Sequence, residues 1–224
     1  MSKVLVITGG IGSGKSEVCR ILRNLGYTFQ YDADSRVKML YEECPGLLQS
    51  IEDKLECSLR DGSGKFMPSL LAERIFSDRK SLEDVESLVF PRLMDDFRNY
   101  VRESEESPSF PGLVMIESAT ILEKRALDGI YDAVLFVDAP FEVRLERACR
   151  RDSADRDRIL ARMKNQTVAN GISDIRAGRI PADSMLSAIA AGVDAYVDSN
   201  CSLEELQIRV RKALEEVITK KLSI

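Results

Sequence analysis

The sequence predicts an α/β fold in which a parallel sheet of about five strands is flanked by helices. Three observations lead to this prediction. Short apolar runs recur along the chain, stretches with helical periodicity separate them, and a glycine-rich loop directly follows the first run. With 224 residues, the chain is long enough for one large domain or for one domain with an insertion.

Five segments have the composition of buried parallel strands, with short apolar or β-branched runs bounded by turn residues. The predicted strands are residues 4–7, 27–31, 113–116, 133–137 and 193–197. A last helix is predicted to begin after Ser202, because the sequence Ser-Leu-Glu-Glu is a capping box and an apolar stripe follows it.

About eighty residues separate the second and third predicted strands, far more than one crossover connection requires. Residues 70–101 within this stretch have helical periodicity. We therefore expect a helical insertion at residues 41–110. The core of the fold is expected to consist of residues 1–40 and 111–224, with a lid at about 145–190.

Composition narrows the class of protein. Hydrophobic residues make up 44% and charged residues 31%, the balance of a soluble globular chain. The net charge of -5 argues against a nucleic-acid partner. No apolar run approaches the roughly 20 residues that span a bilayer, and the N-terminus lacks the pattern of a signal peptide. The five scattered cysteines form no CxxC pair, which favours reduced thiols. We expect a cytoplasmic protein that has no membrane partner.

Histidine is absent from the chain, which excludes His-based catalytic triads, His metal ligands and His acid–base pairs. Phosphoryl transfer does not require histidine, because it depends mainly on positioning and on neutralising charge. Residues 9–16, GGIGSGKS, match the phosphate-binding P-loop pattern and follow the first predicted strand. In this motif, backbone N–H groups surround the β-phosphate, Lys15 contacts the β- and γ-phosphates, and the Ser16 hydroxyl binds Mg²⁺.

Two carboxylates, Asp32 and Asp34, follow the second predicted strand. At that end of a parallel sheet they face the phosphate loop, where either can accept a proton from an attacking hydroxyl or help to hold Mg²⁺. Helix capping is the structural alternative for both. Glu117 and Asp138 end the third and fourth predicted strands, and each is a candidate to support the metal.

An arginine-rich stretch begins at residue 144, and within it Arg147 and Arg151 stand four residues apart. On a helix this spacing puts both guanidinium groups on one face, where they can bind phosphate oxygens and neutralise charge in the transition state. A solvated charged face is the alternative for the whole stretch.

Taken together, these motifs resemble the dephospho-coenzyme A kinase family. The resemblance is carried by TGGIGSGKS (8–16), DAD (32–34), an IESA…LE segment (116–123) and VDAP…R…RD (137–152). It implies a P-loop core with a helical domain for the coenzyme A end and a lid. It also implies that ATP and Mg²⁺ are used to phosphorylate the ribose 3′-hydroxyl of dephospho-CoA, a small-molecule acceptor.

The resemblance also assigns individual residues. Asp34 corresponds to the catalytic aspartate and is expected, with Ser16, at the metal, while Arg147 and Arg151 correspond to the lid arginines that act in catalysis with Lys15. The expected ATP loop consists of Gly12, Ser13, Gly14, Lys15, Ser16 and Glu17.

This chain departs from the family's pattern at several positions. Glu17 stands where the family often has Thr or Val, Phe90 replaces the histidine of a His-Pro pair, and Pro68 lies near the place of an expected arginine. Two other functions remain open from the sequence, namely another P-loop kinase of small molecules or nucleotides, and a catalytically silent ATP-binding protein. The sequence assigns no oligomeric state.

Overall fold

The structure, a computed structural model, describes residues 2–124, 127, 129–152, 155–180 and 185–222. These residues divide into two compact units. The first unit ends at Asp32 and resumes at Glu103, and the second comprises Ala33–Arg102. Asp32 and Asp34 therefore belong to different units.

Among the described residues of the first unit, five strands form one parallel sheet in the order β2-β3-β1-β4-β5. The strands are β1 Lys3–Thr8, β2 Gln30–Asp32, β3 Leu113–Glu117, β4 Ala133–Asp138 and β5 Ala195–Asp198. This sheet confirms the predicted fold class. Parallel strands bring all their carboxyl ends to one edge, which is where ligands bind in open α/β sheets.

Two strands begin later than the sequence predicts, because turns occupy their expected first residues. The N–H of Tyr27 donates to the carbonyl oxygen of Leu22 and continues the C-terminal turn of the preceding helix, so β2 begins at Gln30. The N–H of Val193 similarly donates to the carbonyl oxygen of Ala190, so β5 begins at Ala195.

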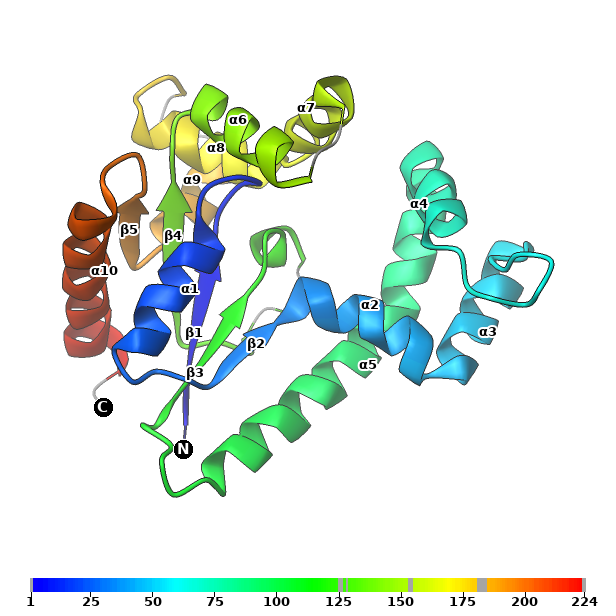
Figure 1. Cartoon of the computed structure of the whole chain (residues 1–224), viewed down its shortest axis with the longest axis horizontal. Helices are drawn as coiled ribbons and strands as arrows, with labels where there is room; N and C mark the ends of the chain where they lie inside the picture. The colour runs from blue at the N-terminus through cyan, green and yellow to red at the C-terminus, as the bar shows by residue number, and fades with distance from the viewer. Residues whose placement is uncertain (1, 125–126, 128, 153–154, 181–184, 223–224) are drawn as a thin grey trace. The chain divides into compact units, whose positions relative to one another are not determined.

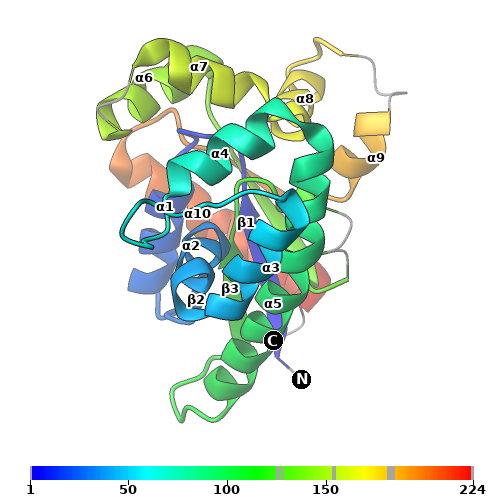
Figure 2. The same cartoon turned by 90° about the vertical axis from the view of Figure 1, so that its right-hand side faces the viewer.

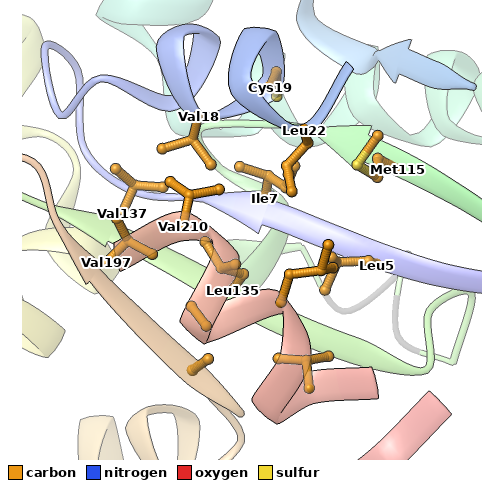
Figure 3. Packing of buried hydrophobic residues seen from close by; sticks show 14 of the residues in the cluster. Leu5, Ile7, Val18, Cys19, Leu22, Met115, Leu135, Val137, Val197 and Val210 are labelled. Atoms are coloured by element: carbon orange, nitrogen blue, oxygen red, sulfur yellow. The ribbon is translucent and has the colours of Figure 1, made fainter. Parts of the chain in front are cut away.

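One face of the sheet packs against helices α1 (Lys15–Asn24) and α10 (Leu203–Val217), which are in contact with each other. Figure 3 shows Val18 and Leu22 of α1 and Val210 of α10 against the strand residues Ile7 and Leu135. All five side chains are fully buried. Burial of each such side chain contributes about 1.5–3 kcal/mol, so this cluster holds the beginning of α1 in place directly behind the phosphate loop.

Four helices follow β4 and extend to β5. They are α6 Phe141–Asp152, α7 Arg156–Lys164, α8 Thr167–Arg176 and α9 Met185–Ala191. Figures 1 and 2 show α6 and α7 at the carboxyl-terminal edge of the sheet. Leu145, Ala148, Ile159 and Met163 form a small core between α6 and α7, and Ile11 of the phosphate loop packs against it. Residues 153–154 and 181–184 of the expected lid lie outside the described residues.

The second unit is helical, with α2, α3, α4 and the greater part of α5. Their bounds are α2 Ala33–Glu43, α3 Pro45–Leu55, α4 Pro68–Ser77 and α5 Arg79–Glu105. Pro68 begins α4, a position where the missing N–H of proline has no partner to lose. Phe90 and Pro91 lie within α5. The guanidinium of Arg36 in α2 holds the Asp96 carboxylate of α5 through two hydrogen bonds of 2.6 and 2.9 Å.

No helix in the part of the chain that the structure describes combines the length and hydropathy that a membrane crossing requires.

The capping of α10 gives a test of the fold. The Ser202 hydroxyl accepts the N–H of Glu205 at 3.2 Å, as the capping box predicts. Ser202→Ala removes this acceptor and should lower the free energy of unfolding by about 1 kcal/mol. Urea denaturation followed by circular dichroism measures the change. Ser202→Asp retains a capping oxygen and should stay close to wild type, and equal losses in both variants would contradict the capping role.

Candidate active site

The phosphate loop, residues 9–14, connects β1 to α1 and fits tightly against its neighbours. Gly9 and Gly12 have φ angles of 144° and 75°, which residues with side chains rarely adopt. A Cβ on Gly9 would lie 2.1 Å from the carbonyl oxygen of Val137, and a Cβ on Gly12 would lie 2.0 Å from that of Arg144. The glycines therefore supply the backbone conformation and also let β4 and α6 approach the loop.

Lys15 is the first residue of α1, and its side chain folds back over the loop. Its Nζ donates to the carbonyl oxygens of Gly9 at 2.9 Å and Gly10 at 3.3 Å. This arrangement holds the ammonium group beside the loop backbone, so the positive charge lies next to the N–H groups that would surround a phosphate.

Ser16 and Glu117 meet where α1 begins and β3 ends. The Ser16 hydroxyl donates to Oε1 of Glu117 at 2.9 Å. Asp32 at the end of β2 is the register partner of Glu117 in the neighbouring strand. All three residues line one cavity of about 340 Å³. The structure therefore brings a hydroxyl and two carboxylates together beside the phosphate loop.

The other candidate acids have different surroundings. Asp138 at the end of β4 accepts the N–H of Ala139 at 2.9 Å and the Ser173 hydroxyl at 2.8 Å, so its carboxylate is engaged with α8. Asp34 lies in the first turn of α2, within the second unit. The sequence offers Glu117 and Asp138 as candidates to support the metal. Of these two, Glu117 is the one that contacts Ser16.

Glu17 lies in the first turn of α1 beside the loop, where the negative charge of its carboxylate would repel a bound phosphate. Its carboxylate forms a salt bridge with Arg20, and that hydrogen bonding lowers the pKa of Glu17. The arginine offsets the negative charge of the glutamate, so this departure from the family's pattern is accommodated within α1.

Arg147 and Arg151 both lie in α6, but they have different partners. The Arg147 guanidinium donates to the hydroxyl and the carbonyl oxygen of Ser199, at 2.9 and 3.0 Å. Arg151 forms two hydrogen bonds with the carboxylate of the adjacent Asp152, which raise the pKa of Arg151 and lower that of Asp152. Arg147 thus connects α6 to the loop after β5, while Arg151 stays near the surface.

The structure also shows three residues around the loop that the sequence did not single out for a role. The buried Ser199 hydroxyl donates to the carbonyl oxygen of Ser13 at 2.6 Å and so links Arg147 to the loop. Gln166 accepts the N–H of Ile11 at 2.7 Å. Arg144 is only 2% exposed, and burial lowers its pKa. No local motif marks these contacts, because each joins residues far apart in the sequence.

Comparison with known proteins assigns the family. Residues 3–173 match the family model described as dephospho-CoA kinase. A dephospho-CoA kinase from Porphyromonas gingivalis is 38% identical over 172 residues, which cover 75% of this chain and 81% of that protein. Another from Frankia casuarinae is 31% identical over 216 residues, covering 96% of this chain and 83% of that protein. A crystal structure of a Thermus thermophilus protein superposes with a TM-score of 0.70 at 27% identity and covers 96% of both chains. The chain belongs to the dephospho-CoA kinase family.

The buried thiol beside the candidate metal residues gives a second test. Cys19 lines the same cavity as Ser16, and burial, assisted by the charge of Glu117, raises its pKa. At a pH of about 8.5, where an ordinary cysteine is half ionised, Cys19 should remain protonated and unreactive. We expect it to be alkylated by iodoacetamide more slowly than Cys57, as measured by peptide mass spectrometry. Denatured protein serves as the control, and equal rates in the native protein would contradict the burial.

Proposed function

We propose that this member of the dephospho-CoA kinase family transfers the γ-phosphoryl group of ATP to the ribose 3′-hydroxyl of dephospho-CoA, giving CoA and ADP. The observation that carries the proposal is the contact between Ser16 of the phosphate loop and Glu117, in a cavity that Asp32 also lines. This arrangement supplies the positive, hydroxyl and carboxylate groups that phosphoryl transfer uses, in a chain without histidine.

The phosphates of ATP would be held by the backbone N–H groups of residues 12–17 and by Lys15. The ammonium of Lys15 now donates to carbonyl oxygens of its own loop. Phosphate oxygens are stronger acceptors because they carry charge, so Lys15 would exchange these contacts for the β- and γ-phosphates. The N-terminus of α1 adds its dipole to the same site.

Mg²⁺ fits the oxygen groups around Ser16. This ion prefers hard oxygen ligands, and it is usually bound through one or two carboxylates together with substrate phosphates. The Ser16 hydroxyl, with Glu117 and Asp32 beside it, matches that chemistry. When bound, the ion would neutralise phosphate charge.

The acceptor hydroxyl needs a carboxylate to take its proton during attack. We assign this role to Asp34, which corresponds to the catalytic aspartate of the family. It stands two residues beyond Asp32 in the DAD sequence and belongs to the second unit. We assign binding of dephospho-CoA to that helical unit as well. The residue that accepts the proton would then lie in the same unit as the residues that bind this substrate.

The arginines of α6 would stabilise the transferred phosphoryl group. Arg147 is held by Ser199, whose hydroxyl also contacts the loop at Ser13, so its guanidinium has a fixed place near the phosphates. Arg151 forms an ion pair with the adjacent Asp152, and its side chain is 61% exposed. Exposed ion pairs are weak, so phosphate can replace Asp152 as the partner of Arg151.

A cytoplasmic location agrees with the state of the thiols. All five cysteines lie within the described residues and are free. Thiols persist in this form in the reducing cytosol.

The reaction itself is the primary test. With ATP and Mg²⁺ present, we expect ADP release and CoA formation only when dephospho-CoA is added, measured by a coupled assay and by mass spectrometry of the product. Lys15→Ala serves as the inactive control, because groups of this kind contribute about 10²–10³ in rate. Turnover of a nucleoside monophosphate or another small molecule in place of dephospho-CoA would assign a different kinase. ATP binding without any turnover would indicate a silent binding protein.

Substitution of the two aspartates separates their roles. Asp34→Asn keeps the shape of the side chain but removes the proton acceptor, so kcat should fall by about 10²–10⁴. Asp32→Asn should instead weaken the binding of Mg²⁺, measured as a higher Mg²⁺ concentration for half-maximal rate. Calorimetry with ADP, in the presence and absence of Mg²⁺, shows whether nucleotide binding is retained. Wild-type kcat in Asp34→Asn would remove Asp34 from the mechanism and leave Asp32 as the next candidate.

A further inference from the structure

Gln166 occupies the position before the first residue of α8, yet its side chain does not cap that helix. The side chain is buried, and its Oε1 accepts the N–H of Ile11 at 2.7 Å. These two residues are 155 positions apart in the sequence. Glutamine is not among the preferred residues at this helical position, so local helix formation does not explain the side chain. The contact with the phosphate loop does.

Ile11 is held on both its backbone and its side chain. Its side chain packs against the core formed by Leu145, Ala148, Ile159 and Met163 in α6 and α7. The loop turns tightly around it, since the N–H of Ser13 donates to the carbonyl oxygen of Gly10 at 3.0 Å. The Ile11 N–H is thus bonded to Gln166 and the Ser13 N–H to Gly10, so both hold the turn of the loop in its conformation.

A second contact comes from the next turn of α8. Asn170 lies four residues after Gln166 and therefore on the same helical face. Its Oδ1 accepts from Arg144 at 2.8 Å, and its Nδ2 donates to the carbonyl oxygen of Met163 at 2.8 Å. The Arg144 guanidinium in turn lies against Gly10, where Nη1 would be only 1.6 Å from an added Cβ. One face of α8 thus supports residues 10–11 of the loop both directly and through Arg144.

We propose that Gln166 is a positioning residue for the nucleotide phosphates. By fixing Ile11 it holds the outer turn of the loop in its phosphate-binding conformation before nucleotide arrives, so binding does not have to order the loop. The inference rests on the proposed function only in taking an adenine nucleotide as the ligand. It does not depend on the identity of the acceptor.

The test compares ADP binding to variants of the full chain, measured by calorimetry with Mg²⁺. Gln166→Met keeps the length of the side chain but removes the oxygen acceptor. Its Kd for ADP should rise about tenfold, which corresponds to the roughly 1.4 kcal/mol of one hydrogen bond. Gln166→Glu retains an oxygen at the same distance but adds a negative charge beside the phosphate loop, so it should recover only part of the affinity. Asn165→Leu, an exposed amide one residue earlier, is the matched control and should bind ADP as wild type does.

In steady-state assays, Gln166→Met should raise KM for ATP and leave KM for dephospho-CoA unchanged. The change in kcat should be smaller than the change in KM for ATP, because a preorganised loop binds the substrate and the transition state equally well. An unchanged ADP affinity in a folded Gln166→Met protein, even with a lower melting temperature, would overturn the proposal and leave Gln166 as a structural residue. If the proposed acceptor is wrong, dephospho-CoA gives no turnover, but the ADP result is unaffected.

Hydrogen exchange on the wild-type protein tests the proposal without any variant. The Ile11 amide should be protected from exchange in the nucleotide-free protein, and adding ADP should change its protection little. Rapid exchange of this amide without nucleotide, followed by strong protection with ADP, would show that the nucleotide orders the loop and would overturn the proposal.

Discussion

The close approach of backbone to backbone at the phosphate loop is the constraint on which the rest of the site depends. The carbonyl oxygens of Val137 and Arg144 lie where the side chains of residues 9 and 12 would be, so only glycine fits at either position. Because the loop is pressed against the end of β4 and the first turn of α6, the place of α6 is determined by the place of the loop. The arginines of that helix are therefore positioned relative to the phosphate loop by main-chain packing.

The arginines of helix α6 have different partners, because they lie on different faces of the helix. Arg144 points into the protein, where it supports Gly10 and bonds to Asn170. Arg147 bonds to Ser199 after β5. The phosphate loop, α8 and the residues that follow β5 thus all contact helix α6. A change in the packing of α6 would therefore alter the loop and Arg147 together.

The sequence predicts the parts of this structure that depend on local pattern. Strands β1, β3 and β4 appear as apolar runs and the cap of α10 as a Ser-x-x-Glu motif, and the structure confirms them, whereas β2 and β5 begin later than predicted. The phosphate loop appears as GGIGSGKS between β1 and α1. Contacts between residues far apart in the sequence cannot be predicted from local pattern. Arg144 is one of several arginines in a charged stretch, and nothing near it in the sequence indicates that it alone is buried. The bond between Gln166 and Ile11 likewise depends on how α8 packs.

The DAD sequence shows how two carboxylates that are close in the sequence come to have different surroundings. Asp32 ends β2, and the parallel register places it beside Glu117 and in the cavity of Ser16. Asp34 lies in the first turn of a helix of the other unit, so the sheet does not fix its side chain. The change from strand to helix within three residues therefore gives the two carboxylates different surroundings. Asp32 lies beside the residues proposed to hold the metal, and Asp34 lies in the unit proposed to bind the acceptor.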